Sequence, residues 1–155
     1  MLIDEINSDI IREFILTYYT HEYLESVNHR RALVLSRNYG IAAHRYSILY
    51  SGKTKVSWRT LKYLPYYNNL SSNLGLAYLS HDIGGFENGT EDAELYTRYV
   101  QLGTYSPIFR FSSKNGRYYK REPWKWDTLT LNIVKNYTRL RNKLIPYIYS
   151  EAYKY

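Results

Sequence analysis

The chain has no cysteine among its 155 residues. Disulfide bonds, thiolate zinc sites and cysteine nucleophiles are therefore excluded. The first residues, MLIDEINSDIIREF, carry acidic side chains early and lack a basic segment followed by an apolar one, so no signal peptide is predicted. No apolar run approaches the ~18 residues that a membrane-spanning helix needs. These absences are compatible with a reducing cytoplasm, and we expect a cytoplasmic protein without a membrane partner.

Blocks of like charge and metal-ligand clusters are also missing. The formal net charge is +7, but lysine and arginine are scattered and nowhere form a block of five. A mixed, solvated surface is the favoured interpretation, and a tyrosine-rich nucleic-acid binder is a rival hypothesis. No histidine has metal-ligand spacing, so no metal or other cofactor is predicted. The four histidines are His21, His29, His44 and His81.

Two kinds of short motif carry no functional prediction. The segment Ser51-Gly52-Lys53-Thr54 resembles the end of a phosphate-binding loop, but Ser47 stands where that loop needs a glycine. Three triplets have the pattern of glycosylation acceptors, which is frequent by chance and has no meaning without secretion. They begin at Asn69, Asn88 and Asn136.

What the sequence does contain is enough length and apolar content, 45%, for one compact domain with a core. Short apolar runs alternate with helical stripes, and alternating β and α elements imply an α/β fold with a parallel sheet. Four such units form either a small open sheet or half of an eight-stranded barrel. The expected strands cover residues 32–35, 46–50, 74–79 and 106–111, and the expected helices cover 9–25, 57–70, 91–102 and 127–148.

Single residues are expected to begin or interrupt these helices. Ser8 is a candidate N-cap for the first helix. Asp92 lies in the first turn of the third helix, where acidic side chains are favourable. Asp127 is expected to cap the last helix. Two prolines are expected to disturb their helices, Pro65 by interruption and Pro146 by a kink.

The segment Gly75 to Phe86 reads GLAYLSHDIGGF. An apolar run leads into Asp82 and breaks at Gly84-Gly85, where two glycines allow a tight turn that a ligand can approach closely. Because parallel sheets bind ligands at the carboxyl ends of their strands, Asp82 is the first candidate functional residue. The alternative is a surface turn in which Asp82 caps the next helix.

Several segments occur together in an order typical of one enzyme family. They are Ser36-Arg37, Arg45-Tyr46 to Ser51-Gly52, Trp58, His81 to Phe86, Glu94-Leu95, Gln101-Leu102-Gly103, Ser106-Pro107, Arg110 and Glu122-Pro123-Trp124. In this order they resemble the second half of the catalytic (β/α)8 TIM barrel of glycoside hydrolase family 31, the α-glucosidases and α-xylosidases. The resemblance covers roughly residues 30–152.

The resemblance implies a retaining α-glycosidase that hydrolyses terminal α-glucosidic or α-xylosidic bonds with two aspartates. Retaining chemistry needs a nucleophile and an acid/base carboxyl group about 5 Å apart. The family's nucleophile precedes the matched region, and residues 1–30 do not supply it. Lys53 stands at the acid/base position after Gly52. An unperturbed lysine, with a pKa of about 10.4, is poorly suited to that task. No catalytic residue is therefore intact.

Other sugar-contacting positions agree better with the family pattern. Arg37 matches an arginine after the fifth strand, and Asp82 matches an aspartate that hydrogen-bonds sugar hydroxyls in the first subsite. Phe86 matches an aromatic pocket residue, and Tyr50 replaces a tryptophan there. Ser112 replaces a histidine. The expected substrate-binding residues are thus Arg37, Tyr50, Asp82 and Phe86.

A full barrel takes about 250 residues, so residues 1–155 are expected to be a partial domain and an inactive fragment: a truncated or split gene product, or part of a longer enzyme. Its expected partners are an α-linked oligosaccharide, bound by the parent enzyme, and either the missing first half of the barrel or a second copy. The alternative is a non-catalytic carbohydrate-binding or barrel-completing subunit.

Overall fold

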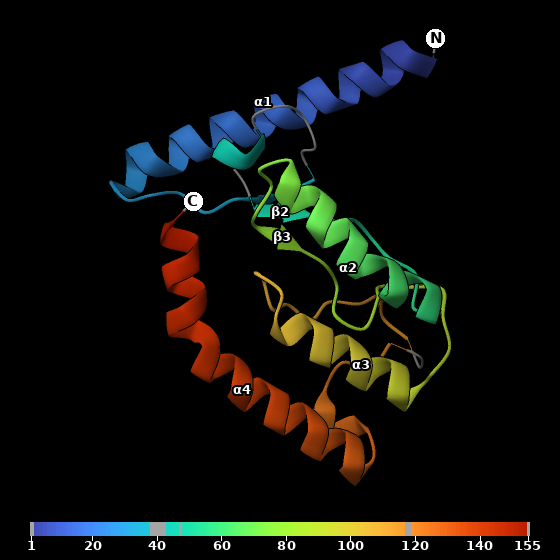
Figure 1. Cartoon of the computed structure of the whole chain (residues 1–155). Helices are drawn as coiled ribbons and strands as arrows, with labels where there is room; N and C mark the ends of the chain where they lie inside the picture. Colours follow the sequence, from blue (N-terminus) through green and yellow to red (C-terminus); the bar gives the residue numbers. More distant parts are fainter. Residues whose placement is uncertain (1, 38–42, 47, 117–118, 155) are drawn as a thin grey trace. The chain divides into compact units, whose positions relative to one another are not determined.

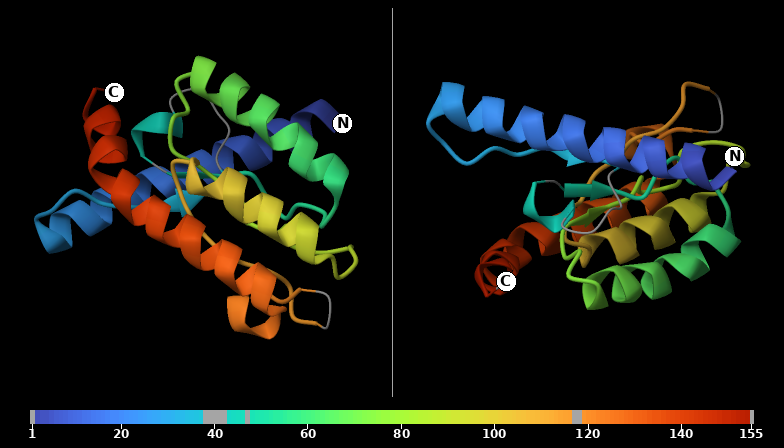
Figure 2. Two further views of the ribbon diagram at one scale, coloured as in Figure 1. Left: turned by 60° about the horizontal axis from the view of Figure 1, so that its bottom comes forward. Right: turned by 90° about the horizontal axis from the view of Figure 1, so that it is seen from above.

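The computed structural model describes residues 2–37, 43–46, 48–116 and 119–154. The chain forms two compact units, Met1–Gly52 with Asn68–Ser80 (unit 1) and Lys53–Tyr67 with His81–Tyr155 (unit 2). The elements appear in Figure 1, with two further views in Figure 2. In chain order they are α1 (Leu2–Asn28), β1 (Leu35–Ser36), the 3₁₀ helix η1 (Ala43–Arg45), β2 (Ile48–Tyr50), α2 (Trp58–Asn73), β3 (Leu79–Ser80), α3 (Ala93–Thr104), the 3₁₀ helix η2 (Pro123–Lys125) and α4 (Thr128–Tyr153).

Unit 1 contains a parallel sheet with the strand order β1-β2-β3. Leu35 pairs with Ile48, and Leu49 pairs with Leu79 in the next ladder. Parallel neighbours need long connections, and α2 lies within the connection from β2 to β3. The α/β class predicted from the alternating pattern is therefore confirmed.

The first strand differs from the prediction of a strand at 32–35 that is buried on both faces. β1 starts only at Leu35, and Leu33 and Leu35 are 78% and 46% exposed. In the described part of the sheet β1 pairs with β2 on one side. An edge strand leaves side chains open to solvent even where the sequence is apolar. Residues 38–42, which follow Arg37, lie outside the described residues.

The apolar run at 74–79 is divided between a helix end and a strand. The amide of Leu74 donates to the carbonyl of Leu70, and Gly75, with φ +79°, donates to Ser72. This C-terminal turn of α2 uses the first residues of the run. The strand is consequently shorter than predicted and begins at Leu79.

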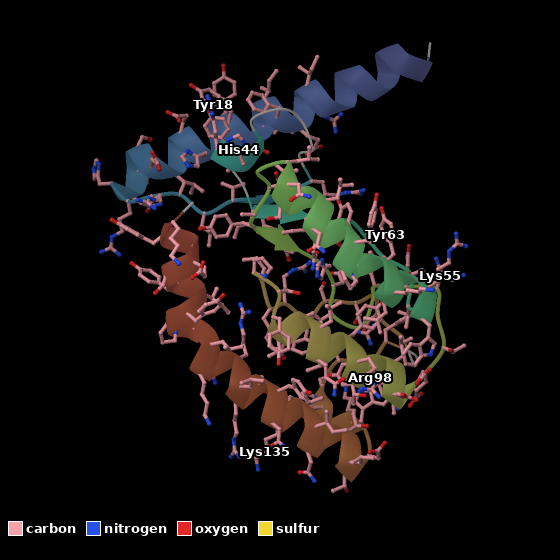
Figure 3. The ribbon with its side chains drawn as sticks, in the orientation of Figure 1. Tyr18, His44, Lys55, Tyr63, Arg98 and Lys135 are labelled. Carbon is pink, nitrogen blue, oxygen red and sulfur yellow. The ribbon has the colours of Figure 1, made fainter. Side chains whose placement is uncertain are left out.

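Three ring side chains of the long helix α1 pack around one tyrosine ring of unit 1. The rings of Phe14, Tyr18 and His21 lie 5.8, 5.4 and 5.5 Å from that of Tyr46 in edge-on geometry, and Tyr18 is labelled in Figure 3. The predicted first helix is confirmed. It begins at Leu2, however, so Ser8 lies inside the helix and does not cap it.

α2 runs from Trp58 to Asn73 without interruption, and the predicted break at Pro65 is wrong. A proline in a helix removes one backbone hydrogen bond and crowds the preceding turn. Pro65 is exposed, whereas its neighbour Leu64 is buried in the core of unit 2. We attribute the continuity of the helix to this packing, which outweighs the local cost of the proline.

Unit 2 has its core around α3, which lies beside α4 in all three ribbon views (Figure 1, Figure 2). The predicted N-cap Asp127 is confirmed, because it accepts from the amide of Thr130. Asp92, predicted only in the acidic first turn, is the N-cap of α3 and accepts from the amide of Leu95. Leu129, an apolar residue in the first turn of α4, is exposed. The buried core residues are Val56, Leu64, Ile83, Leu95, Tyr96, Tyr99, Val100 and Val134.

The fourth predicted strand, at 106–111, is wrong as regular structure. Among the described residues, the segment makes one backbone contact of the strand type, from the amide of Ile83 to the carbonyl of Arg110 at 3.1 Å. Its first carbonyls are used elsewhere, since Arg141 of α4 donates to Ser106 and Pro107. We attribute the absence of a regular strand to these hydrogen bonds, because Arg141 competes with a neighbouring strand for the same carbonyl groups.

α4 continues through Pro146 to Tyr153, and Figure 1 shows it bending toward its C-terminal end, as a helix with an internal proline is expected to do. Among the described residues, no helix combines the length and apolar character needed to cross a membrane.

Candidate functional site

Asp82 follows β3 by two residues and forms a buried ion pair. Its side chain is 0% exposed, and Nη2 of Arg110, whose side chain is 28% exposed, donates to Oδ1 at 2.6 Å. The alternative interpretation, in which Asp82 caps the next helix, is wrong because Asp92 caps α3. Of the two groups, the partly exposed guanidinium can be reached by a polar ligand, and it holds the enclosed carboxylate in place.

The turn after Asp82 depends on its two glycines. The amide of Gly85 donates to the carbonyl of Asp82 at 2.9 Å, and Gly84 and Gly85 have φ values of +95° and +77°. A Cβ atom on Gly84 would lie 2.5 Å from Nε of Arg121, and one on Gly85 would lie 2.8 Å from Cα of Val56. Because glycine has no side chain, Arg121 can lie close to Gly84 and the backbone of Val56 can lie close to Gly85.

Unit 2 brings Lys53 next to Phe86. The amide of Phe86 donates to the carbonyl of Thr54 at 2.7 Å, and that of Val56 donates to Glu87 at 2.9 Å. This short parallel pairing places the Lys53 ammonium 5.3 Å from the centroid of the Phe86 ring, within the range of a cation–π interaction. Two of the predicted positions therefore meet at one side of the glycine turn.

Arg37 and Tyr50 both belong to unit 1, where they lie at the carboxyl ends of neighbouring strands. Arg37 follows β1, and its guanidinium group lies against Gly52: a Cβ atom there would be 2.9 Å from Nη2. Tyr50 is the last residue of β2 and pairs in register with Ser80. Both positions agree with the expectation that polar groups gather at strand ends.

Two residues of the site were missed by sequence reasoning, and His81 is the first. It is 1% exposed, with Nε2 3.4 Å from the hydroxyl of Ser106, and its Nδ1 has no hydrogen-bond partner among the described residues. Burial, followed by the nearby charge of Arg110, lowers the pKa of His81 to about 4. The imidazole is therefore neutral near pH 7. Its signal in the sequence was its place beside Asp82 after an apolar run.

Arg121 is the second missed residue. Its Nη2 donates to the carbonyls of Gly84 at 2.9 Å and Gly85 at 2.6 Å, and its Nη1 donates to Lys120 at 2.7 Å. In the sequence Arg121 lies in a polar, basic stretch, residues 112–122, for which no binding role was predicted. Its position directly before Glu122-Pro123-Trp124 was the available signal.

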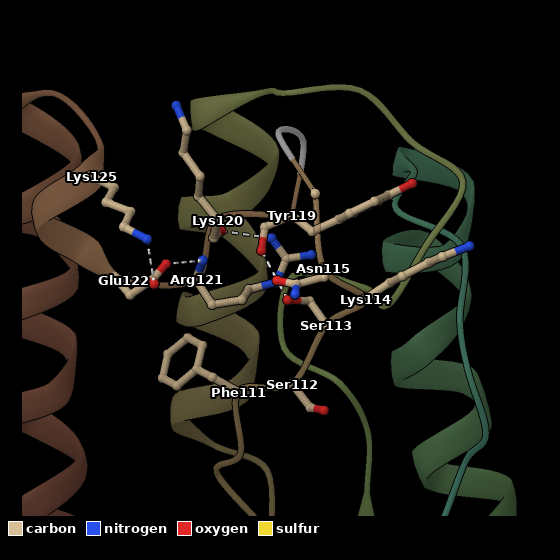
Figure 4. Close-up of a pocket in the computed structure, with 11 residues that line it drawn as sticks. Phe111, Ser112, Ser113, Lys114, Asn115, Tyr119, Lys120, Arg121, Glu122 and Lys125 are labelled. Carbon is tan, nitrogen blue, oxygen red and sulfur yellow. Dashed lines mark hydrogen bonds and ion pairs between the residues drawn. The ribbon is translucent and has the colours of Figure 1, made fainter.

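The same loop forms a polar pocket of about 380 Å³ in unit 2 (Figure 4). At its rim Lys125 donates to Glu122 at 2.6 Å, and this hydrogen bond is the main cause that lowers the pKa of Glu122 to about 2. Ser112 lies in the lining. The described residues contain no group of three histidine or acidic side chains that could hold a metal ion. The pocket is lined by Phe111, Ser112, Ser113, Lys114, Asn115, Gly116, Tyr119, Lys120, Arg121, Glu122 and Lys125.

The chain is similar to known glycosidases over most of its length. It is 33% identical over 139 residues to an alpha-xylosidase of Saccharolobus solfataricus, covering 86% of this chain and 18% of that protein. It is 34% identical over 125 residues to neutral alpha-glucosidase C of Mus musculus, covering 79% of this chain and 14% of that one. The chain thus spans a small part of these relatives.

A solved structure and a family model agree with this relationship. A dextranase from Flavobacterium johnsoniae, complexed with glucose, matches with a TM-score of 0.81 and 27% identity over 90% of this chain and 18% of its own. Residues 12–151 match the family model described as the TIM-barrel domain of glycosyl hydrolases family 31. The chain therefore belongs to glycoside hydrolase family 31.

Proposed function

We propose that residues 1–155 correspond to the second half of a family 31 (β/α)8 barrel and supply part of its sugar-binding site. The observation that carries this proposal is the buried Asp82–Arg110 ion pair directly after β3. The parallel order β1-β2-β3 supports the barrel assignment, and so does the small share of the relatives that the chain covers, 18% and 14%.

The proposed substrate is a saccharide with a terminal α-linked glucose or xylose unit. The relatives named as an alpha-xylosidase and an alpha-glucosidase support this class. In the proposed site, the Asp82 carboxylate, which is enclosed in this structure, opens to the sugar and hydrogen-bonds two adjacent hydroxyls. Phe86 offers an aromatic face to the apolar side of the ring. Arg37 and Tyr50, in unit 1, are proposed as further sugar contacts because their positions match the family pattern.

We infer that these residues alone do not hydrolyse glycosides. Two observations support the inference: the sequence lacks the segment that carries the family's nucleophile, and Lys53 stands at the acid/base position. Its ammonium group faces the Phe86 ring. In the proposed site Lys53 therefore contributes a positive charge to the pocket and does not donate the proton that a leaving group requires.

Sugar binding by the purified chain tests the proposal. Isomaltose is titrated against the ¹⁵N-labelled protein, and Asp82→Asn is expected to weaken binding about tenfold to hundredfold, because hydrogen bonds to a charged group are lost. Asp127→Asn is the matched control, since asparagine also serves as an N-cap. Equal affinity of the Asp82→Asn variant and the wild type would contradict the proposed site.

Turnover is measured on the same proteins with p-nitrophenyl α-glucoside and α-xyloside. The wild-type chain is expected to show no rate above that of buffer. A measurable rate that disappears in Asp82→Asn but persists in Asp127→Asn would overturn the inference that the chain is inactive.

A non-catalytic subunit that completes a barrel with another polypeptide is the second candidate. The exposed apolar side chains Leu33 and Leu35 beside and within β1 favour it, because such a strand edge can pair with a further strand. An adjacent reading frame that encodes the first half of the barrel with an aspartate nucleophile would support this candidate.

A further inference from the structure

The guanidinium group of Arg121 binds the turn that joins Asp82 to Phe86. It donates to both glycine carbonyls of that turn, at 2.9 and 2.6 Å. We propose that Arg121 is a positioning residue that fixes the Gly84-Gly85 turn in its sugar-binding conformation. This role rests on the proposed function of Asp82 and Phe86 in sugar binding.

The turn needs an external restraint because its own backbone is permissive. Both glycines have positive φ, and glycine loses more conformational freedom on ordering than any other residue. One local hydrogen bond, from the amide of Gly85 to the carbonyl of Asp82, closes the turn. Two charge-assisted hydrogen bonds from one planar group restrict both peptide units at once.

Arg121 is itself anchored to the core of unit 2. Its carbonyl accepts from the hydroxyl of Tyr96 at 2.7 Å, and the Tyr96 ring is stacked on Trp126 with centroids 4.9 Å apart. Burial lowers the pKa of Arg121, so the group has left water for these protein contacts. Because Tyr96 of α3 holds the backbone of Arg121, the rigidity of that helix can be transmitted to the turn.

The turn is held from a second side by the chain that follows β2. Thr54 accepts from the amides of Phe86 and Glu87, while Lys114, from the loop of Arg121, donates its amide to the carbonyl of Phe86 at 3.0 Å. Phe86 is thus fixed between two segments. The Gly84 and Gly85 carbonyls are the points at which Arg121 acts, and they lie between Phe86 and Asp82 in the chain.

The experiment compares Arg121→Gln and Arg121→Lys with the wild-type chain. Lysine keeps the charge but lacks the planar guanidinium group, in which Nη1 donates to the Lys120 carbonyl while Nη2 donates to both glycine carbonyls. Amide hydrogen exchange of Gly85 and Phe86 is followed by NMR, together with isomaltose affinity. Arg98→Gln is the matched control: Arg98 lies on α3, is exposed and contacts Glu94 and Gln101 (Figure 3).

For both Arg121 variants we expect exchange at Gly85 and Phe86 to accelerate about tenfold to hundredfold, with less for lysine, while core amides such as that of Val100 keep their protection. Isomaltose binding is expected to weaken in the same order. Arg98→Gln is expected to change neither readout.

Two results would overturn the positioning role. One is unchanged exchange at Gly85 and Phe86 in both variants. The other is equal acceleration throughout unit 2, which would make Arg121 a general stabilising residue. If the wild-type chain binds no isomaltose, the proposed function fails, and the exchange data still decide whether Arg121 fixes the turn.

Discussion

At the scale of single residues, the glycine turn and His81 show how closely this site is packed. Gly84 contacts a guanidinium group where any side chain would collide, and His81 is enclosed next to an ion pair. Neither constraint follows from residue type, because glycine and histidine are both common on protein surfaces. Each constraint gives a measurable effect on stability.

Gly84→Ala is expected to lower the free energy of unfolding by about 2–4 kcal/mol, because it combines a strained φ of +95° with a 2.5 Å contact to Arg121. Gly75→Ala is the control, since Gly75 has a φ of +79° but no atom within 4 Å of the added methyl group. Its expected loss is about 1 kcal/mol. Urea unfolding measures both, and equal losses would contradict the contact.

Because His81 is buried in its neutral form, the folded chain is expected to lose stability in mild acid. The pKa of His81 is lowered from 6.5 to about 4 by burial, so between these pH values the unfolded chain binds more protons than the folded one. Stability is therefore retained above pH 6.5 and lost as the pH falls toward 4, by up to about 3 kcal/mol. His81→Gln should flatten this part of the profile.

Urea unfolding between pH 4 and 8 measures the effect of His81. His29→Gln serves as the control, because it removes an exposed histidine instead of the buried one. A wild-type slope that persists in His81→Gln would contradict the assignment.

At the scale of elements, an arginine of α4 forms hydrogen bonds with the end of α3 and the segment that follows it. Arg141 donates to the carbonyls of Thr104, Ser106 and Pro107 and lies 5.9 Å from the Phe109 ring centroid. These bonds join the end of one helix to the middle of another. They also explain why residues 106–111 do not form the predicted strand.

Arg141→Met is expected to destabilise the chain by about 2–3 kcal/mol, because three carbonyls lose a charged donor while the apolar stem remains. Arg139→Met, on an exposed position of the same helix, is expected to change stability by less than about 0.5 kcal/mol. Thermal unfolding followed by circular dichroism compares the two. Similar melting temperatures for both variants would show that the three hydrogen bonds contribute little.

At the scale of the whole molecule, the chain carries apolar surface that an isolated domain rarely exposes. In unit 1, exposed apolar side chains lie beside and within the edge strand β1 and along α1. Long exposed apolar faces and free strand edges favour association. The side chains in question are Ile11, Ile15, Tyr19, Tyr23, Val27, Leu33 and Leu35.

We therefore expect the purified chain to self-associate or to melt without a sharp transition. Size-exclusion chromatography with light scattering and a thermal melt measure this. Leu33→Lys with Leu35→Lys should raise the monomer fraction, since charged edges resist pairing, whereas Leu129→Lys, at an exposed position of α4, should not. A stable, cooperatively melting wild-type monomer would contradict the partial-domain proposal.

The sequence by itself determined the α/β class, the starts of α3 and α4 and the place of Asp82 after a strand. These features depend on neighbours in the chain: each cap bonds an amide three residues away. The family assignment also came from ordered sequence segments and is confirmed. The start of β3 was misplaced because the same apolar residues also suit the end of α2.

Only the tertiary structure decided which groups surround Asp82. Arg110 lies 28 residues further along the chain, and Arg121 lies 36 residues beyond Gly85. No periodicity or spacing encodes such contacts, because they arise from the packing of α3, α4 and the loop between them. For the same reason the need for glycine at positions 84 and 85 was visible in the sequence, but its physical cause, the approach of Arg121 and Val56, was not.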